Sequence, residues 1–245
     1  MMFPGIISKA ATLIHIPHAG IIVPSLAGFV VDRYRIDREI KLLTDWHTDR
    51  IFDVAGIDRL ICPWSRVFCD VERLLEGEKM EAVGMGMFYT HCDDGTLLRE
   101  DRDGARDVVL GFYRAHHQAL EQAVAVKLKA HGHCLLIDAH SFTDLPLKRD
   151  LDKSPHRPDI CIGTTQENTP EQVVDHFQQM FQQHDLSVEI NRPYSGSMVP
   201  RKFIGDPKFI SIMVEINRAI YIRNFTGILR LNSIITKAIN GLGVA

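Results

Sequence analysis

The sequence predicts an α/β protein in which helices cover both faces of a mixed, mainly parallel sheet, as a three-layer α/β/α sandwich. Short β-branched runs alternate with longer helical patterns along the chain, an order typical of this class. Several runs are apolar on consecutive residues, as expected of central strands that are covered on both faces. No repeat or low-complexity linker interrupts the order, so we expect a single domain over residues 1–245.

Seven short segments carry the strand pattern, because each is rich in aliphatic and β-branched residues and is bounded by polar residues, Gly or Pro. In chain order they are TLIHI (12–16), RLICPW (59–64), RVFCDV (66–71), CLLIDA (134–139), DICIGT (159–164), SVEIN (187–191) and FISIMVEIN (209–217).

The strongest helix pattern covers residues 105–130, where one apolar stripe recurs at helical spacing. The stripe consists of Leu110, Tyr113, His117, Leu120, Val124 and Leu128. Further helices are predicted over 37–54, 170–184 and 225–239, with Asp37 and the Thr169-Pro170 pair as starts. The stretches 74–104 and 142–158 are rich in charge, Gly and Pro, so we expect functional loops over the strand ends.

The composition favours a small ligand over a macromolecular partner. Apolar residues make up 45% of the chain and charged residues 24%, with a formal net charge of -3. Without a block of Lys or Arg, nucleic acid and anionic membrane are poor candidates. A small anionic ligand needs only two or three local arginines and therefore fits. The sequence leaves the oligomeric state open.

The cysteines indicate a reducing compartment. The five thiols include no CxxC pair, and three of them stand in apolar runs, so we expect buried free thiols and a cytoplasmic protein. The N-terminal segment is interrupted by Pro4, Gly5 and Lys9 and lacks a basic start, so it does not read as a signal peptide.

Polar residues follow several predicted strands at the point where each strand ends. His18 lies just past a predicted strand in LIHIPHAG, and Asp138 and His140 follow the apolar run of LLIDAHSF. Glu215 stands in SIMVEINRAIY, and Asp70 stands in RVFCDVER. Strand ends are where open α/β sheets build their sites. Two histidines from different strand ends, with one carboxylate from a helix, form a ligand set for zinc that leaves one position open to water. A further glutamate is the base that such a centre needs.

Seven motifs, in this order, resemble the N-formylglutamate amidohydrolase family from about residue 12 to 240. They are HIPHAG, TDWHTDRIF, SRVFCDVER, GMGMFYT, LIDAHSF, NRPYSGSMVPRKF and MVEINRAIY. The resemblance implies a fold like that of the zinc carboxypeptidases. It also implies hydrolysis of the formyl amide of N-formyl-L-glutamate to formate and glutamate.

The resemblance implies a role for each matching residue. His18, His140 and Asp45 would hold one zinc ion or a similar divalent cation, with Asp49 as the alternative to Asp45 because the two lie one helical turn apart. Glu215 would be the general base.

Five further motif residues would contact the substrate or the reacting carbonyl. Arg66 is expected to stabilise the oxyanion, and the carboxylates of a small anionic acyl-amino acid would be held by Arg73, Asn191, Arg201 and Tyr221. The chain departs from the family pattern at Glu72, where many members carry Asn. Two alternatives remain open: deacylation of another small acyl-amino acid or peptide, and a non-catalytic binding module.

Two other histidines have structural interpretations. His15 is expected to face a neighbouring element rather than the metal, and His117 is expected to be a hydrogen-bonded core histidine with possible contact to the ligands. Asp138 either orients a ligand or caps a turn.

Overall fold

The computed structural model describes residues 7–242, and a six-stranded mixed sheet lies at its centre. The strand order is β2–β1–β3–β6–β4–β5. β4 pairs antiparallel with β6, and the other described pairs are parallel, which confirms the predicted mixed, mainly parallel sheet. The strands are β1 (Thr12–Ile16), β2 (Asp58–Ile61), β3 (Cys134–Phe142), β4 (Ile160–Gly163), β5 (Val188–Ile190) and β6 (Phe209–Asn217).

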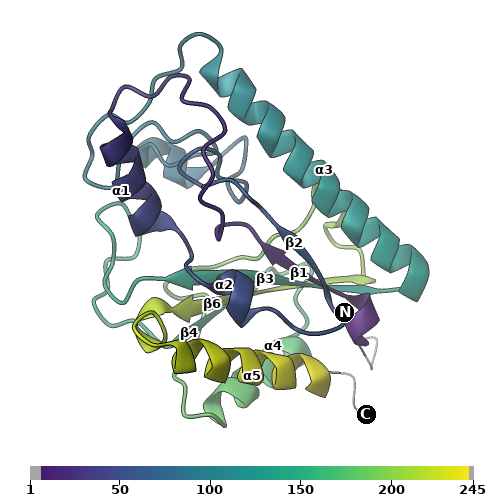
Figure 1. Cartoon of the computed structure of the whole chain (residues 1–245). Helices are drawn as coiled ribbons and strands as arrows, with labels where there is room; N and C mark the ends of the chain where they lie inside the picture. The colour runs from purple at the N-terminus through teal and green to yellow at the C-terminus, as the bar shows by residue number, and fades with distance from the viewer. Residues whose placement is uncertain (1–6, 243–245) are drawn as a thin grey trace.

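Helices cover both faces of this sheet, as the sequence predicts. The long α3 lies along one face, and α4 and α5 lie along the other, together with the short α2 (Figure 1). The α-helices are α1 (Arg33–Leu43), α2 (Thr48–Ile51), α3 (Ala105–His131), α4 (Glu171–Gln182) and α5 (Phe225–Gly241). Short 3-10 helices occupy Lys9–Ala11, Lys79–Val83, Arg201–Phe203 and Arg218–Ile220.

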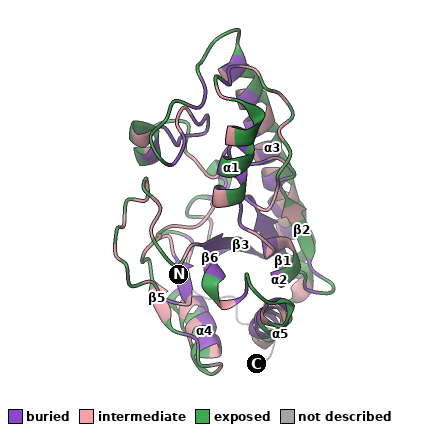
Figure 2. Cartoon of the chain, turned by 60° about the vertical axis from the view of Figure 1, so that its left-hand side comes forward, coloured by how far each residue is buried: buried purple, intermediate pink, exposed green. Residues whose placement is uncertain are grey.

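Both central strands, β3 and β6, are buried along their whole length, which explains why they are apolar on consecutive residues (Figure 2). Successive side chains of a strand point to opposite faces. Accordingly, Leu135 and Ile137 pack in the cluster that contains residues of α4 and α5, whereas Leu136 packs with Leu120 and Val124 of α3.

The predicted strand over 66–71 is wrong, because these residues form irregular turns. The Phe68 N–H donates to the Ser65 carbonyl (2.9 Å), which closes one of the turns. Val67 and Phe68 are buried in a second apolar cluster beside the sheet, together with Met87 and Phe88 of the following loop. Their apolar character therefore serves this cluster and not a strand.

The predicted helix over 37–54 is split in two. α1 begins directly after Asp32, whose side chain accepts a hydrogen bond from the Arg35 N–H and caps the first turn. The helical hydrogen bonding then stops, because the Asp45 N–H donates to the His18 carbonyl (3.0 Å) at the end of β1. His47 follows with a left-handed φ of 67° before α2 begins. This break, and not a continuous helix, holds Asp45.

The buried stripe of α3 agrees with the predicted one in part and contains three of its residues, Tyr113, Leu120 and Val124. The buried positions include Val109 and His116 instead of Leu110 and His117, which are half-buried. This difference buries a polar side chain, which is tolerated because the His116 ring is hydrogen-bonded inside the protein (2.8 Å to His15).

The five cysteines are free and buried, as expected. Burial raises the pKa of the Cys62, Cys134 and Cys161 thiols to about 12, which makes them poor nucleophiles. Among residues 7–242, no helix combines the length and the apolar character that crossing a membrane requires. Pro4 and Gly5 lie outside the described residues.

Candidate metal centre

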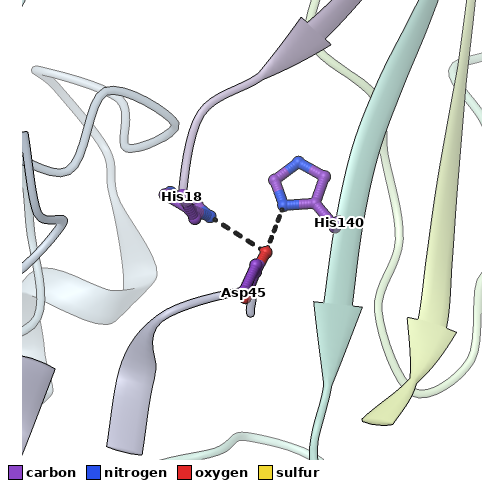
Figure 3. A group of neighbouring side chains, drawn as sticks. All are labelled: His18, Asp45 and His140. Carbon is purple, nitrogen blue, oxygen red and sulfur yellow. Dashed lines mark hydrogen bonds and ion pairs between the residues drawn. The ribbon is translucent and has the colours of Figure 1, made fainter. Parts of the chain in front are cut away.

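The three predicted metal ligands come together at the carboxyl end of the parallel strands. His18 follows β1, Asp45 lies in the break between α1 and α2, and His140 is on β3 (Figure 3). One donor atom from each of the three lies within 4.8 Å of the others, and all three residues are buried. Asp49 lies on α2 and is not part of this group. The break in the predicted helix therefore brings Asp45, and not Asp49, into this group.

Both imidazoles turn their Nδ1 atom toward the same oxygen of Asp45. The distances to Asp45 Oδ2 are 3.6 Å from His18 and 3.3 Å from His140. The backbone N–H of Ser141 also donates to this oxygen (3.1 Å). Burial alone would raise the pKa of Asp45, but the adjacent imidazoles outweigh burial and lower that pKa, so the carboxylate is ionised.

The other nitrogen of each ring faces a second carboxylate. His18 Nε2 is hydrogen-bonded to Asp70 Oδ1 (2.8 Å), and His140 Nε2 lies 3.2 Å from Asp138 Oδ1, off the line of a regular hydrogen bond. An outer carboxylate that holds the far nitrogen of a histidine is the usual support of a metal-binding imidazole. Within the described part of the chain, His18 Nδ1 and Asp45 Oδ1 have no hydrogen-bond partner. These donors fit a divalent cation.

Asp70 connects His18 of the candidate metal group to two arginines, Arg66 and Arg73. Besides His18, its carboxylate accepts hydrogen bonds from Arg66 (2.9 Å) and from the Tyr89 hydroxyl (2.6 Å), and it lies 3.3 Å from Arg73 Nε. Burial opposes its ionisation, but Arg66, His18 and Arg73 outweigh burial and hold the pKa of Asp70 well below its usual range. In the sequence, Asp70 stands out only as a polar residue in RVFCDVER, and nothing there gives it this role.

Glu215 lies beside the three donors, because it is paired in register with His140 across β3 and β6. It is buried, and its Oε2 atom has no partner among residues 7–242. Burial raises the pKa of Glu215 to about 7, so this carboxyl group can both accept and donate a proton near neutral pH.

A cavity of about 620 Å³ opens onto the group and is lined by His18, Asp45, His140, Glu215, Arg66 and Arg73 among others. Both predicted loops contribute to its wall, through residues from Leu74 to Met85 and from Phe142 to Asp152. A larger cavity of about 830 Å³ shares Thr143 and Arg218 with it but is not lined by any of the three donors.

Three residues expected to bind substrate do not line this cavity. Asn191 follows β5, is exposed and bonds to Thr164 (2.7 Å). Arg201 is exposed at the start of a 3-10 helix. Tyr221 is fully buried and donates its hydroxyl to the Trp46 carbonyl (2.8 Å). It is therefore packed in the interior and does not line the cavity.

A second group of potential donors, formed by His15, Glu72 and Asp138, lies against the first. As expected, His15 faces a neighbouring element: its Nε2 contacts His116 of α3. His117 is hydrogen-bonded through Nε2 to the Val71 carbonyl (2.8 Å). Burial, together with the nearby Asp138 carboxylate, raises the pKa of Glu72 well above its usual range.

Comparisons with known proteins agree with this architecture. The chain is similar to N-formylglutamate amidohydrolase from Ralstonia eutropha JMP134, with a TM-score of 0.81 and 21% identity over 95% of this chain and 92% of that one. It is also similar to the gene product Atu2144 from Agrobacterium tumefaciens, with a TM-score of 0.69 and 15% identity over 96% and 92% of the two chains. At these identities the likeness establishes the fold.

Among curated proteins, no significant match was found. The sequence model of the N-formylglutamate amidohydrolases matches residues 10–222, which is most of the chain. The chain therefore belongs to the N-formylglutamate amidohydrolase family.

Proposed function

We propose that this protein is a zinc-dependent amidohydrolase that cleaves N-formyl-L-glutamate to formate and glutamate. The family supports the reaction and the substrate. The observation that carries the metal dependence is the convergence of His18, Asp45 and His140, each of which brings one donor atom within 4.8 Å of the others.

His18, Asp45 and His140 would hold the ion, since two imidazoles and one carboxylate are a donor set typical of catalytic zinc. Zinc bound there would supply Lewis acidity, which activates water and polarises a carbonyl group. The outer contacts of the two histidines with Asp70 and Asp138 support this assignment.

Glu215 is the proposed general base. It accepts a proton from the water that attacks the formyl carbon, and a new C–O bond forms. It then donates a proton to the glutamate nitrogen as the C–N bond breaks, which releases formate and the free amine. The raised pKa of Glu215, about 7, supports both steps, because a group with a pKa near the working pH exchanges protons readily in either direction.

Arg66 and Arg73 are the proposed partners of the negative charges. Both line the cavity, and both are fixed from behind by Asp70. We assign Arg66 to the oxygen of the tetrahedral intermediate, because its Nη1 lies 4.0 Å from Asp45 Oδ1 and is therefore close to the metal donors. Arg73 lies beside it and is assigned to a substrate carboxylate, which a guanidinium can grip with two hydrogen bonds.

Formate release from N-formyl-L-glutamate, measured before and after removal of metal with a chelator, tests this proposal. We expect turnover that the chelator abolishes and that added zinc restores. N-acetyl- and N-succinyl-L-glutamate serve as controls for the acyl group. Full activity of the metal-free protein would contradict the metal dependence, and a preference for another acyl group would contradict the substrate.

A further inference from the structure

A buried chain of polar side chains leads away from the metal donors to the long helix α3. His116 Nε2 lies 2.8 Å from His15 Nε2, and His15 Nδ1 lies 3.0 Å from Asp138 Oδ1. The same Asp138 oxygen lies 3.2 Å from His140 Nε2. All four residues are buried. Side chains from α3, β1 and β3 are thereby linked, although His116 is distant from the donors in the sequence.

The donor and acceptor properties of these groups determine which nitrogen carries the proton in each hydrogen bond. A carboxylate only accepts hydrogen bonds, so His15 must carry its proton on Nδ1 to bond with Asp138. A neutral imidazole then has an acceptor at Nε2, so the proton between the two rings must belong to His116 Nε2. Burial lowers the pKa of His116 to about 2 and also lowers the pKa of His15, which agrees with two neutral rings that share one proton.

We propose that His116 is a positioning residue that acts on the metal donor His140 through His15 and Asp138. The inference rests on the proposed function only in taking His140 as a metal ligand. The His116 N–H fixes the tautomer of His15, and the His15 N–H in turn holds the Asp138 carboxylate beside His140.

Both carboxylate oxygens of Asp138 accept hydrogen bonds. Oδ1 accepts the hydrogen bond of His15, and Oδ2 accepts one from the backbone N–H of Met198 (2.9 Å). The carboxylate so fixed favours a proton on the nearby Nε2 of His140. The lone pair of His140 is then on Nδ1, the atom that faces Asp45. His116 therefore contributes to the availability of this lone pair for a metal ion.

Loss of the His116 donor would leave His15 Nε2 as a buried acceptor without a partner. Such a group is unfavourable unless the ring turns or water enters. Either change would loosen the contact between His15 and Asp138. Outer-shell substitutions of this kind typically weaken metal binding 10- to 100-fold. Because His116 is two contacts removed from the ligand, we expect an effect of about 10-fold.

Two substitutions at His116 separate the hydrogen bond from packing. His116→Gln places an N–H group near the position of Nε2, whereas His116→Met fills a similar volume without a donor. His117→Met is the matched control, because it removes an imidazole hydrogen bond of the same length (2.8 Å) from the same helix. The zinc dissociation constant of each purified protein is measured by competition with a chromophoric chelator.

The proposal predicts about 10-fold weaker zinc binding for His116→Met and near-normal binding for His116→Gln and His117→Met. Equal affinity of His116→Met and the wild type would overturn it, as would equal losses in the Met and Gln variants. Absence of zinc binding by the wild type would instead overturn the proposed function.

The tautomers of the metal-free wild type provide a test that does not depend on any variant folding. In ¹⁵N-labelled wild-type protein, correlations of the ring nitrogens with the carbon-bound ring protons identify each tautomer, and through-space contacts with neighbouring residues assign each ring. We expect the proton of His15 on Nδ1 and the proton of His116 on Nε2. A proton on His15 Nε2 would contradict the proposed order of donors and acceptors in these hydrogen bonds.

Discussion

Glu215→Gln should lower the turnover of N-formyl-L-glutamate about 100-fold or more while the bound metal stays in place. Glutamine has nearly the same shape as the carboxyl group but cannot accept the proton of the attacking water. The buried setting that raises the pKa of Glu215 holds the side chain beside His140 and is not altered by this substitution. Turnover is measured as formate released, and the metal content is determined on the same sample.

Glu189→Gln is the control for Glu215→Gln. Glu189 also lies on a strand of the sheet, but its side chain is half-exposed and pairs with Arg192 outside the cavity. We expect it to leave turnover unchanged. A Glu215→Gln protein with bound metal and near-normal turnover would remove Glu215 from the role of base.

Asp70→Asn should lower the free energy of unfolding of the metal-free protein by about 3 kcal/mol, because it leaves buried positive charge without its partner. Arg66 and Arg73 both rely on this carboxylate, and His18 is hydrogen-bonded to it. Zinc affinity should fall as well, by about 10- to 100-fold, since His18 loses its outer carboxylate. Urea unfolding and zinc competition measure the two effects.

Asp53→Asn serves as the control for this substitution. Asp53 also pairs with an arginine, Arg59, at 3.1 Å, but its side chain is 60% exposed. Exposed ion pairs contribute about 0–1 kcal/mol, so the control should stay close to the wild type. If the two variants lose the same free energy of unfolding, the contacts of Asp70 do not stabilise the protein more than an exposed ion pair does.

The sequence predicts the central strands best. Because these strands are buried on both faces, they need apolar residues at consecutive positions, and this pattern is visible in the sequence alone. β1 and β6 have the predicted bounds, and β3 begins at the predicted residue. The segment 66–71 has the same local composition, yet its apolar side chains fill a cluster beside the sheet. Local composition cannot distinguish these two uses of apolar residues.

The three residues of the candidate metal group could be predicted from the sequence because each stands at the end of a strand or in a motif of the family. The side chains that hold these residues in place could not be predicted in this way. The contact of His18 with Asp70 spans 52 residues, and that of His15 with His116 spans 101. His116 and His117 are adjacent, and only the way in which α3 packs against the rest of the protein decides which of them is buried. The same lack of long-range information explains why the sequence places Asn191 and Arg201 at the substrate, although they do not line the cavity.

Anomalous diffraction at the zinc absorption edge, from crystals grown with zinc, tests the metal assignment most directly. We predict one strong peak at coordination distance, about 2.0–2.2 Å, from Nδ1 of His18, Nδ1 of His140 and a carboxylate oxygen of Asp45. A peak at the neighbouring group of His15, Glu72 and Asp138 instead, or none within reach of both His18 and His140, would contradict it.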